Sequence, residues 1–117
     1  MVGRRTLSSG VAAAWLVVAA TSAQAASRSE AEAIATRTGE IIGGASACGI
    51  PEGELVALGA KVIRWARDAA RSAAELNRAQ DAHEAAVQRS ADRIGRRGAS
   101  ACDATVRTFR ELEREAR

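Results

Sequence analysis

The sequence is poor in the residue types that carry most catalytic and metal-binding chemistry. It has no tyrosine, one phenylalanine, one proline and one histidine, and its single methionine is Met1. Without tyrosine and an internal methionine, tyrosyl chemistry and His/Met haem ligation are excluded. One histidine makes a poor transition-metal site, and no Gly-x-Ser-x-Gly motif, calcium loop or phosphate loop accompanies it. We therefore expect a protein that is not an enzyme, with no catalytic residues, no metal and no cofactor.

The first 25 residues are organised like a secretory signal peptide. Arg4 and Arg5 precede the apolar run Val11–Ala20, and Ala23–Ala25 is a small-x-small cleavage signal. Ten apolar residues form a helix of about 15 Å, half the roughly 30 Å of a hydrocarbon core, which argues against a membrane anchor. We expect cleavage near Ala25, a location in the periplasm or outside the cell, and no transmembrane span afterwards. Two adjacent arginines leave the general and twin-arginine export routes both open.

Removal of the signal peptide, residues 1–25, from the chain of 117 leaves 92 residues, 26–117, which is the size of one small domain. Two of the 17 basic residues lie in the signal peptide, so 15 basic residues face 14 acidic ones afterwards. A nucleic-acid-binding protein needs a concentrated excess of positive charge. The balance therefore predicts no nucleic-acid partner.

The only two cysteines are Cys48 and Cys102. Pairing is the default in an oxidising compartment. The spacing of the two residues excludes a Cys-x-x-Cys redox motif, a zinc site and a c-type haem attachment. We expect a structural disulfide within one chain, with a bridge between two copies as the alternative.

The spacing of apolar residues predicts helices and no strands. Ser29 and Glu32 form a capping box that begins a helix over about 29–47, in which Gly43-Gly44 is expected to weaken the last turns. Pro51 suits the first turn of the following helix. A last helix is expected from Ser100 to Arg117, with Ser100 and Asp103 at its start.

The middle of the chain carries an apolar seam in alternating steps of four and three, typical of a heptad pattern. It comprises Leu55, Gly59, Val62, Ala66, Ala69, Ala73, Leu76, Gln80, His83, Val87, Ser90 and Ile94. A single helix over 52–95 would be about 66 Å long. It would separate Cys48 from Cys102, whereas a disulfide requires Cα atoms within roughly 7 Å. We therefore expect this segment to fold back on itself.

Two places suit the break. Ser72 and Glu75 form a second capping box, which divides the segment into helices of about 52–71 and 73–95. Asn77–Asp81 is the alternative. In either case the fold class is all-α: a small up-and-down bundle of about four helices, stapled by one disulfide.

Two groups of residues are candidate contact sites. His83, one turn from Gln80 on the seam, is a candidate pH-sensing or ligand contact, although a histidine bonded to a backbone carbonyl is the simpler interpretation. Most basic residues alternate with acids at helical spacing, such as Asp92 with Arg96, which is typical of a solvated face. Arg93, Arg96 and Arg97 form the one local excess, where an anionic partner or membrane surface would dock.

Three functional hypotheses follow. The first is a non-enzymatic periplasmic accessory factor that binds another exported or envelope protein. The second is a holdase-type stress chaperone that exposes its alanine-rich helices when conditions change. The third is binding of a small ligand or metal in the bundle near His83 and Gln80.

Overall fold

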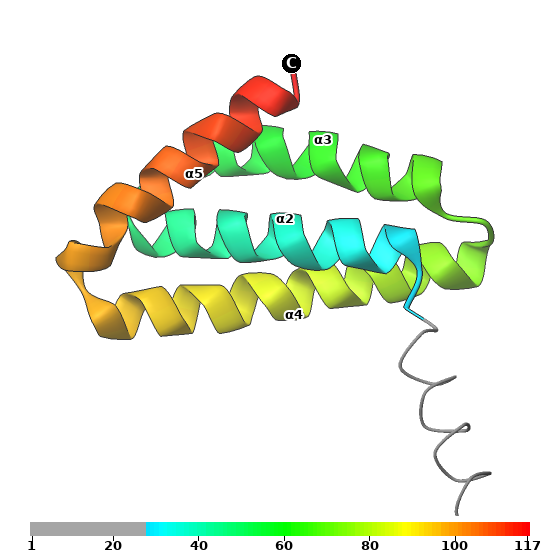
Figure 1. Cartoon of the computed structure of the whole chain (residues 1–117), viewed down its shortest axis with the longest axis horizontal. Helices are drawn as coiled ribbons and strands as arrows, with labels where there is room; N and C mark the ends of the chain where they lie inside the picture. The colour runs from blue at the N-terminus through cyan, green and yellow to red at the C-terminus, as the bar shows by residue number, and fades with distance from the viewer. Residues whose placement is uncertain (1–27) are drawn as a thin grey trace, which may run out of the picture.

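A computed structural model describes residues 28–117, and within this range the chain forms four α-helices and no strand (Figure 1). They are α2 (Glu30–Ala47), α3 (Glu52–Ala69), α4 (Ala73–Arg97) and α5 (Cys102–Glu115), and a 3₁₀ turn, η1 (Ala99–Ala101), precedes α5. The predicted all-α bundle is confirmed. The predicted signal peptide and its cleavage site lie outside the described residues.

Both predicted capping boxes begin a helix. The Ser29 hydroxyl accepts a hydrogen bond from the Glu32 amide at 3.2 Å, and the Ser72 hydroxyl accepts one from the Glu75 amide at 3.1 Å. Each hydroxyl satisfies one of the amide groups that the first turn of a helix leaves without a partner. The turn at Ser72 separates α3 from α4, and the alternative break at Asn77–Asp81 is wrong because α4 runs through it without interruption.

The start of α5 differs from the prediction. Ser100 lies in η1, and α5 begins at Cys102 without a side-chain cap. Gly98 is the reason: with φ at +76° it takes the left-handed conformation that terminates α4. The carbonyl of Gly98 then accepts the amide of Ala101 at 3.2 Å, which closes the 3₁₀ turn before α5.

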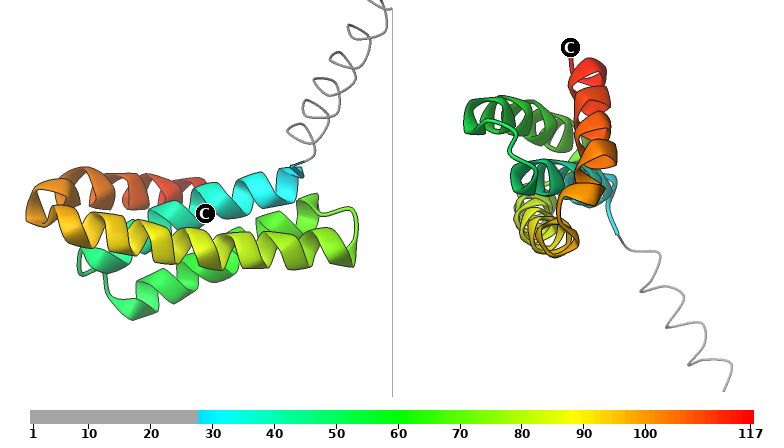
Figure 2. Two further views of the ribbon diagram at one scale, coloured as in Figure 1. Left: turned by 90° about the horizontal axis from the view of Figure 1, so that it is seen from below. Right: turned by 90° about the vertical axis from the view of Figure 1, so that its left-hand side faces the viewer.

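The helices alternate in direction, and α2 lies at the centre (Figures 1 and 2). The other three helices all pack on α2, whereas they make few contacts with one another. In an up-and-down bundle the first and third helices usually face each other diagonally. Here α2 and α4, which run parallel, form the most extensive contact in the molecule.

Glycine makes the close contact of α2 and α4 possible. A Cβ atom at Gly39 would lie 2.6 Å from the carbonyl oxygen of His83 and 3.0 Å from the Cβ of Ala86. At Gly43 it would overlap the backbone of Val87. The helix predicted over about 29–47 is confirmed, and both glycines that were expected to weaken its last turns are buried. Contact with α4 outweighs the low helix propensity of glycine, roughly 1 kcal/mol.

The core has two parts of different composition. Towards the disulfide it contains larger side chains, namely Ile42, Ala45, Ile50, Leu58, Val62, Phe109 and Leu112. Towards the α3–α4 turn the buried residues are all alanines, namely Ala31, Ala35, Ala66 and Ala79. In α4 the predicted seam is confirmed at Ser90 and Ile94, which are buried. Nearer the start of the helix it is displaced, because Ala79 and Ala86 are buried while Gln80 is exposed. Alanine suits the contact between α2 and α4, because the two backbones lie too close together to leave room for larger side chains.

The disulfide Cys48–Cys102 is confirmed, with a Cα–Cα distance of 5.4 Å. It joins the residue after α2 to the first residue of α5. The same pentapeptide, Gly-Ala-Ser-Ala-Cys, ends at each cysteine, over 44–48 and 98–102. The two copies differ in conformation: the first is helical up to Ala47, whereas the second begins with the turn at Gly98.

Replacing both cysteines, Cys48→Ser with Cys102→Ser, is expected to lower the free energy of unfolding by about 4 kcal/mol. The reason is that the bridge closes a loop of 54 residues and removes chain entropy from the unfolded state. Urea denaturation followed by far-UV circular dichroism measures the change. A loss below about 1 kcal/mol would contradict this expectation and would show that helix packing alone holds the fold.

Gly43→Ala is expected to destabilise the protein by about 1–3 kcal/mol, because the added methyl group has to push α4 away from α2. Gly59→Ala is the matched control. It lies in the interior of α3 with open space around its Cα, so alanine there is expected to stabilise the protein by up to about 1 kcal/mol. Equal effects of the two substitutions in urea denaturation would disprove the close contact.

Candidate functional site

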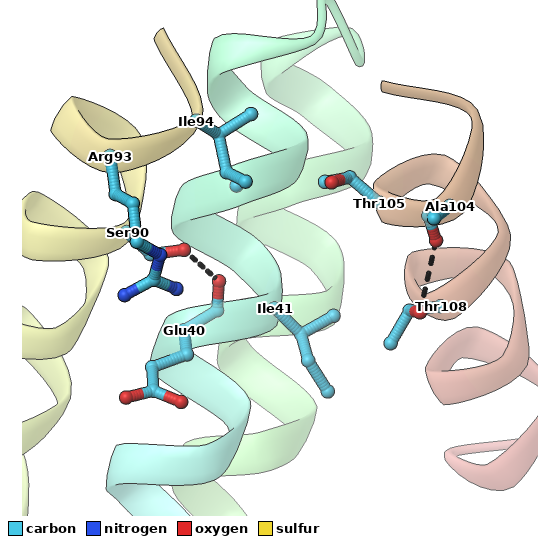
Figure 3. A pocket seen from close by; sticks show the side chains of 9 residues that line it. Glu40, Ile41, Ser90, Arg93, Ile94, Ala104, Thr105 and Thr108 are labelled. Carbon is cyan, nitrogen blue, oxygen red and sulfur yellow. Dashed lines mark hydrogen bonds between the residues drawn. The ribbon is translucent and has the colours of Figure 1, made fainter. Parts of the chain in front are cut away.

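The candidate site is an open groove of about 270 Å³ between α4 and α5, with α2 as its floor (Figure 3). Nine residues line it: Glu40, Ile41 and Gly44 from α2, Ser90, Arg93 and Ile94 from α4, and Ala104, Thr105 and Thr108 from α5. The groove exists because α4 and α5 diverge from the turn that joins them while both pack on α2 (Figure 1).

The α5 wall is held from three directions. Its first residue, Cys102, is bonded to the end of α2. Phe109 and Leu112 are fully buried against α2 and α3. On the other flank, the Arg110 guanidinium donates to Glu54 of α3 and to Glu113, each at 2.7 Å, and these bonds raise its pKa. Together these contacts place α5 over the α2–α3 side of the molecule and away from α4.

Three hydroxyl groups in the groove donate to backbone carbonyls. Ser90 donates to Glu40 at 2.5 Å, Thr105 to Ala101 at 2.8 Å, and Thr108 to Ala104 at 3.0 Å. Their methyl and methylene groups therefore extend the apolar surface formed by the isoleucines and Ala104. Side-chain charge comes from the Glu40 carboxylate and the Arg93 guanidinium, at the edge of the groove (Figure 3).

Arg93 also belongs to a second surface. A shallow depression over the last turns of α4 is lined by Arg89, Asp92, Arg93, Arg96 and Arg97. The structure thus brings the three predicted arginines together, adds Arg89 to them, and joins them to the groove through Arg93. The expected ion pair between Asp92 and Arg96 is not among those formed within residues 28–117.

His83 and Gln80 do not share an environment. Gln80 is exposed, whereas His83 is half-buried with its Nδ1 3.2 Å from the carbonyl oxygen of Ala35. Burial lowers the pKa of His83 from its ordinary value near 6.5, and the hydrogen bond to Ala35 opposes this only in part. Neither residue lines the groove between α4 and α5 or the depression formed by the arginines.

A second groove, of about 320 Å³, lies between α3 and α5. Two of its carboxylates, Glu54 and Glu113, already bind Arg110. An ion pair formed within the protein leaves less charge for a ligand than an unpaired group does, so this groove is the weaker candidate.

Within residues 28–117, no three histidine, cysteine or acidic side chains gather in a way that would hold a metal ion. In the same range, no helix has the length and apolar character needed to cross a membrane. Comparisons with family models, curated proteins and solved structures find no match to this chain.

Most of the groove residues carry no signal in the sequence that would predict a site. They come from three segments that lie far apart in the sequence, and most are small or aliphatic residues without a motif. The one available signal was the repeated pentapeptide, since Gly44 in its first copy reaches Thr105, just beyond its second copy. A Cβ atom at Gly44 would lie 3.0 Å from Thr105 Cγ2, which shows how tightly α5 meets α2 there.

The lowered pKa of His83 predicts acid sensitivity. The unfolded chain binds a proton near pH 6.5, whereas the folded protein binds it only at lower pH, so stability is full above about pH 6.5 and falls as the pH drops below it. Urea denaturation between pH 7.5 and 5 should show this loss, and His83→Gln should reduce it. Gln88→His, which adds an exposed imidazole, should leave the slope unchanged. An identical slope in the wild type and His83→Gln would contradict the prediction.

Proposed function

We propose that this chain is an exported, non-enzymatic accessory protein that binds another exported or envelope protein in the α4–α5 groove. The groove itself is the observation that supports the proposal. It is open along its length, its floor and walls are largely apolar, and charged groups lie at its edge. An apolar centre with a polar rim is the usual anatomy of a protein-binding surface, and grooves between helices commonly accept a helix.

The rigidity of the walls also supports binding. The disulfide ties the end of α2 to the start of α5 at the closed end of the groove, and the glycine contact holds α4 against α2. A preformed site binds more tightly than one that has to be ordered first, because less conformational entropy is lost. We therefore expect the groove to keep its shape when a partner binds.

Site-specific crosslinking in the producing cells tests the proposal. A photoreactive amino acid in place of Thr108, which is exposed and lines the groove, should give one discrete adduct with another exported protein, identified by mass spectrometry. Ala104→Arg, which fills the groove from an exposed position, should abolish the adduct. The same photoreactive residue at Gln88, about 140° around α4 from Arg93, should give none. Adducts of equal yield at both positions, or none at Thr108, would reject the proposal.

A holdase-type chaperone that opens in acid is the second candidate. One observation favours it: His83 is harder to protonate in the folded state, so acid destabilises the fold. The buried residues at the neighbouring end of the core are alanines. Opening that end would expose alanine methyl groups, which supply little apolar area for binding an unfolded chain. Far-UV circular dichroism and sedimentation at pH 3 and pH 7 distinguish the candidates, since an unchanged, monomeric helical protein would remove this one.

A further inference from the structure

The groove and the arginine surface beside it together indicate what kind of partner fits. We infer that the partner segment is an acidic amphipathic helix, with aliphatic side chains in the groove and carboxylates against Arg89, Arg93, Arg96 and Arg97. This inference rests on the proposed function and names the chemistry of the segment bound there. Three observations support it: the arginines form no ion pairs, the groove accepts aliphatic side chains, and Glu40 lies at one edge of the groove.

The four arginines are free to bind an external anion. Within the described part of the chain, none of them takes part in an ion pair. Arg37, Arg78 and Arg110 each bind a carboxylate on a neighbouring helix. Other exposed arginines of the described residues, such as Arg64 and Arg67 of α3, also form no ion pair, so what distinguishes the four is that they lie together beside the groove. Asp92 is the one acidic residue that lines the arginine surface. Guanidinium groups bind carboxylates through bidentate hydrogen bonds, so a partner that carries carboxylates is complementary to this surface.

The groove next to these arginines accepts apolar side chains. At its closed end Gly44 lies between Ile94 and Thr105, and Ile41 and Ala104 continue the apolar surface. A volume of about 270 Å³ corresponds to roughly nine water molecules at about 30 Å³ each. This space suits one or two aliphatic side chains that project from a helix lying across the opening.

The charges also predict how the helix is oriented. The Glu40 carboxylate at the edge of the groove repels carboxylates, whereas Arg93 attracts them from the α4 wall. The acidic stripe of the partner is therefore expected to face α4, beside the aliphatic stripe that enters the groove. The arginines along α4 repel a basic helix, and the repulsion by Glu40 restricts the acidic stripe to the α4 side.

A protein segment fits this surface better than a lipid headgroup layer or a nucleic acid. A concave site with an apolar floor has no counterpart in a phosphate backbone, which offers charge without aliphatic side chains. A bilayer surface would reach the exposed arginines and leave the groove empty. Both remain measurable outcomes of the test.

The test uses the mature protein, residues 26–117, and two fluorescent synthetic helices of equal length. Both carry leucine at positions i, i+3 and i+7; one carries glutamate beside this stripe and the other lysine. Fluorescence anisotropy should show binding of the glutamate helix and at least tenfold weaker binding of the lysine helix. Affinity for the glutamate helix should fall as salt is added, because part of the attraction is between exposed charges.

Paired charge reversals locate the binding surface. Arg93→Glu with Arg96→Glu should weaken binding of the glutamate helix at least tenfold. The matched control, Arg64→Glu with Arg67→Glu, makes the same change in charge at exposed positions of α3 and should leave the affinity unchanged. Ala104→Arg should weaken binding by blocking the groove, and circular dichroism should confirm that all variants remain folded.

Several results would overturn the inference. These are no binding of the glutamate helix up to about 1 mM, equal binding of both helices, or equal loss in the two charge-reversal pairs. Binding of the protein to phosphatidylglycerol vesicles, lost on Arg93→Glu with Arg96→Glu while neither helix binds, would assign the arginines to a membrane surface. A crosslinked partner at Thr108 together with any of these results would preserve the proposed function and reject only the acidic class of partner.

Discussion

The contact between the backbones of α2 and α4 decides where the other helices lie. Gly39 and Gly43 have no side chains, so α4 packs directly on the backbone of α2. On the side of α2 that faces away from α4, α3 and α5 both pack against α2 and share with it the core that contains Val62 and Phe109 (Figure 2). Large side chains fill the contact between helices in most bundles, whereas here the two backbones themselves come together.

The disulfide complements this contact at the other side of α2. Alanine and glycine bury little apolar area, so the α2–α4 contact supplies limited hydrophobic stabilisation. The bridge ties α5 to α2 at the end where Phe109 and Leu112 provide the largest buried side chains. A small domain with few aromatic residues commonly needs such a covalent constraint. The groove results from both constraints, because one holds α4, the other holds α5, and neither brings the two together.

Local patterns predicted the parts of the fold that short stretches of sequence encode. The capping boxes at Ser29 and Ser72 and the pairing of the two cysteines were recognised because each depends on spacing and residue type alone. The role of Gly43 was missed, since helix propensity describes an isolated helix and the contact with α4 outweighs it. The buried face of α4 was predicted correctly at Ser90 and Ile94 but not nearer the start of the helix, where alanines are frequent and the apolar periodicity is therefore weak. The groove combines three distant segments, so no local pattern indicated it.

Small side chains interdigitate only slightly, so they offer little resistance when one helix slides along the other. Hydrogen bonds from α4 to the backbone of α2 supply that resistance: Ser90 donates to the carbonyl of Glu40, and His83 lies against the carbonyl of Ala35. A shift by one helical turn, about 5.4 Å, would break both at once. Together with the ion pair between Arg78 and Glu32, these two side chains help to hold the axial register of the pair, a role that interlocking leucines have in most helical bundles.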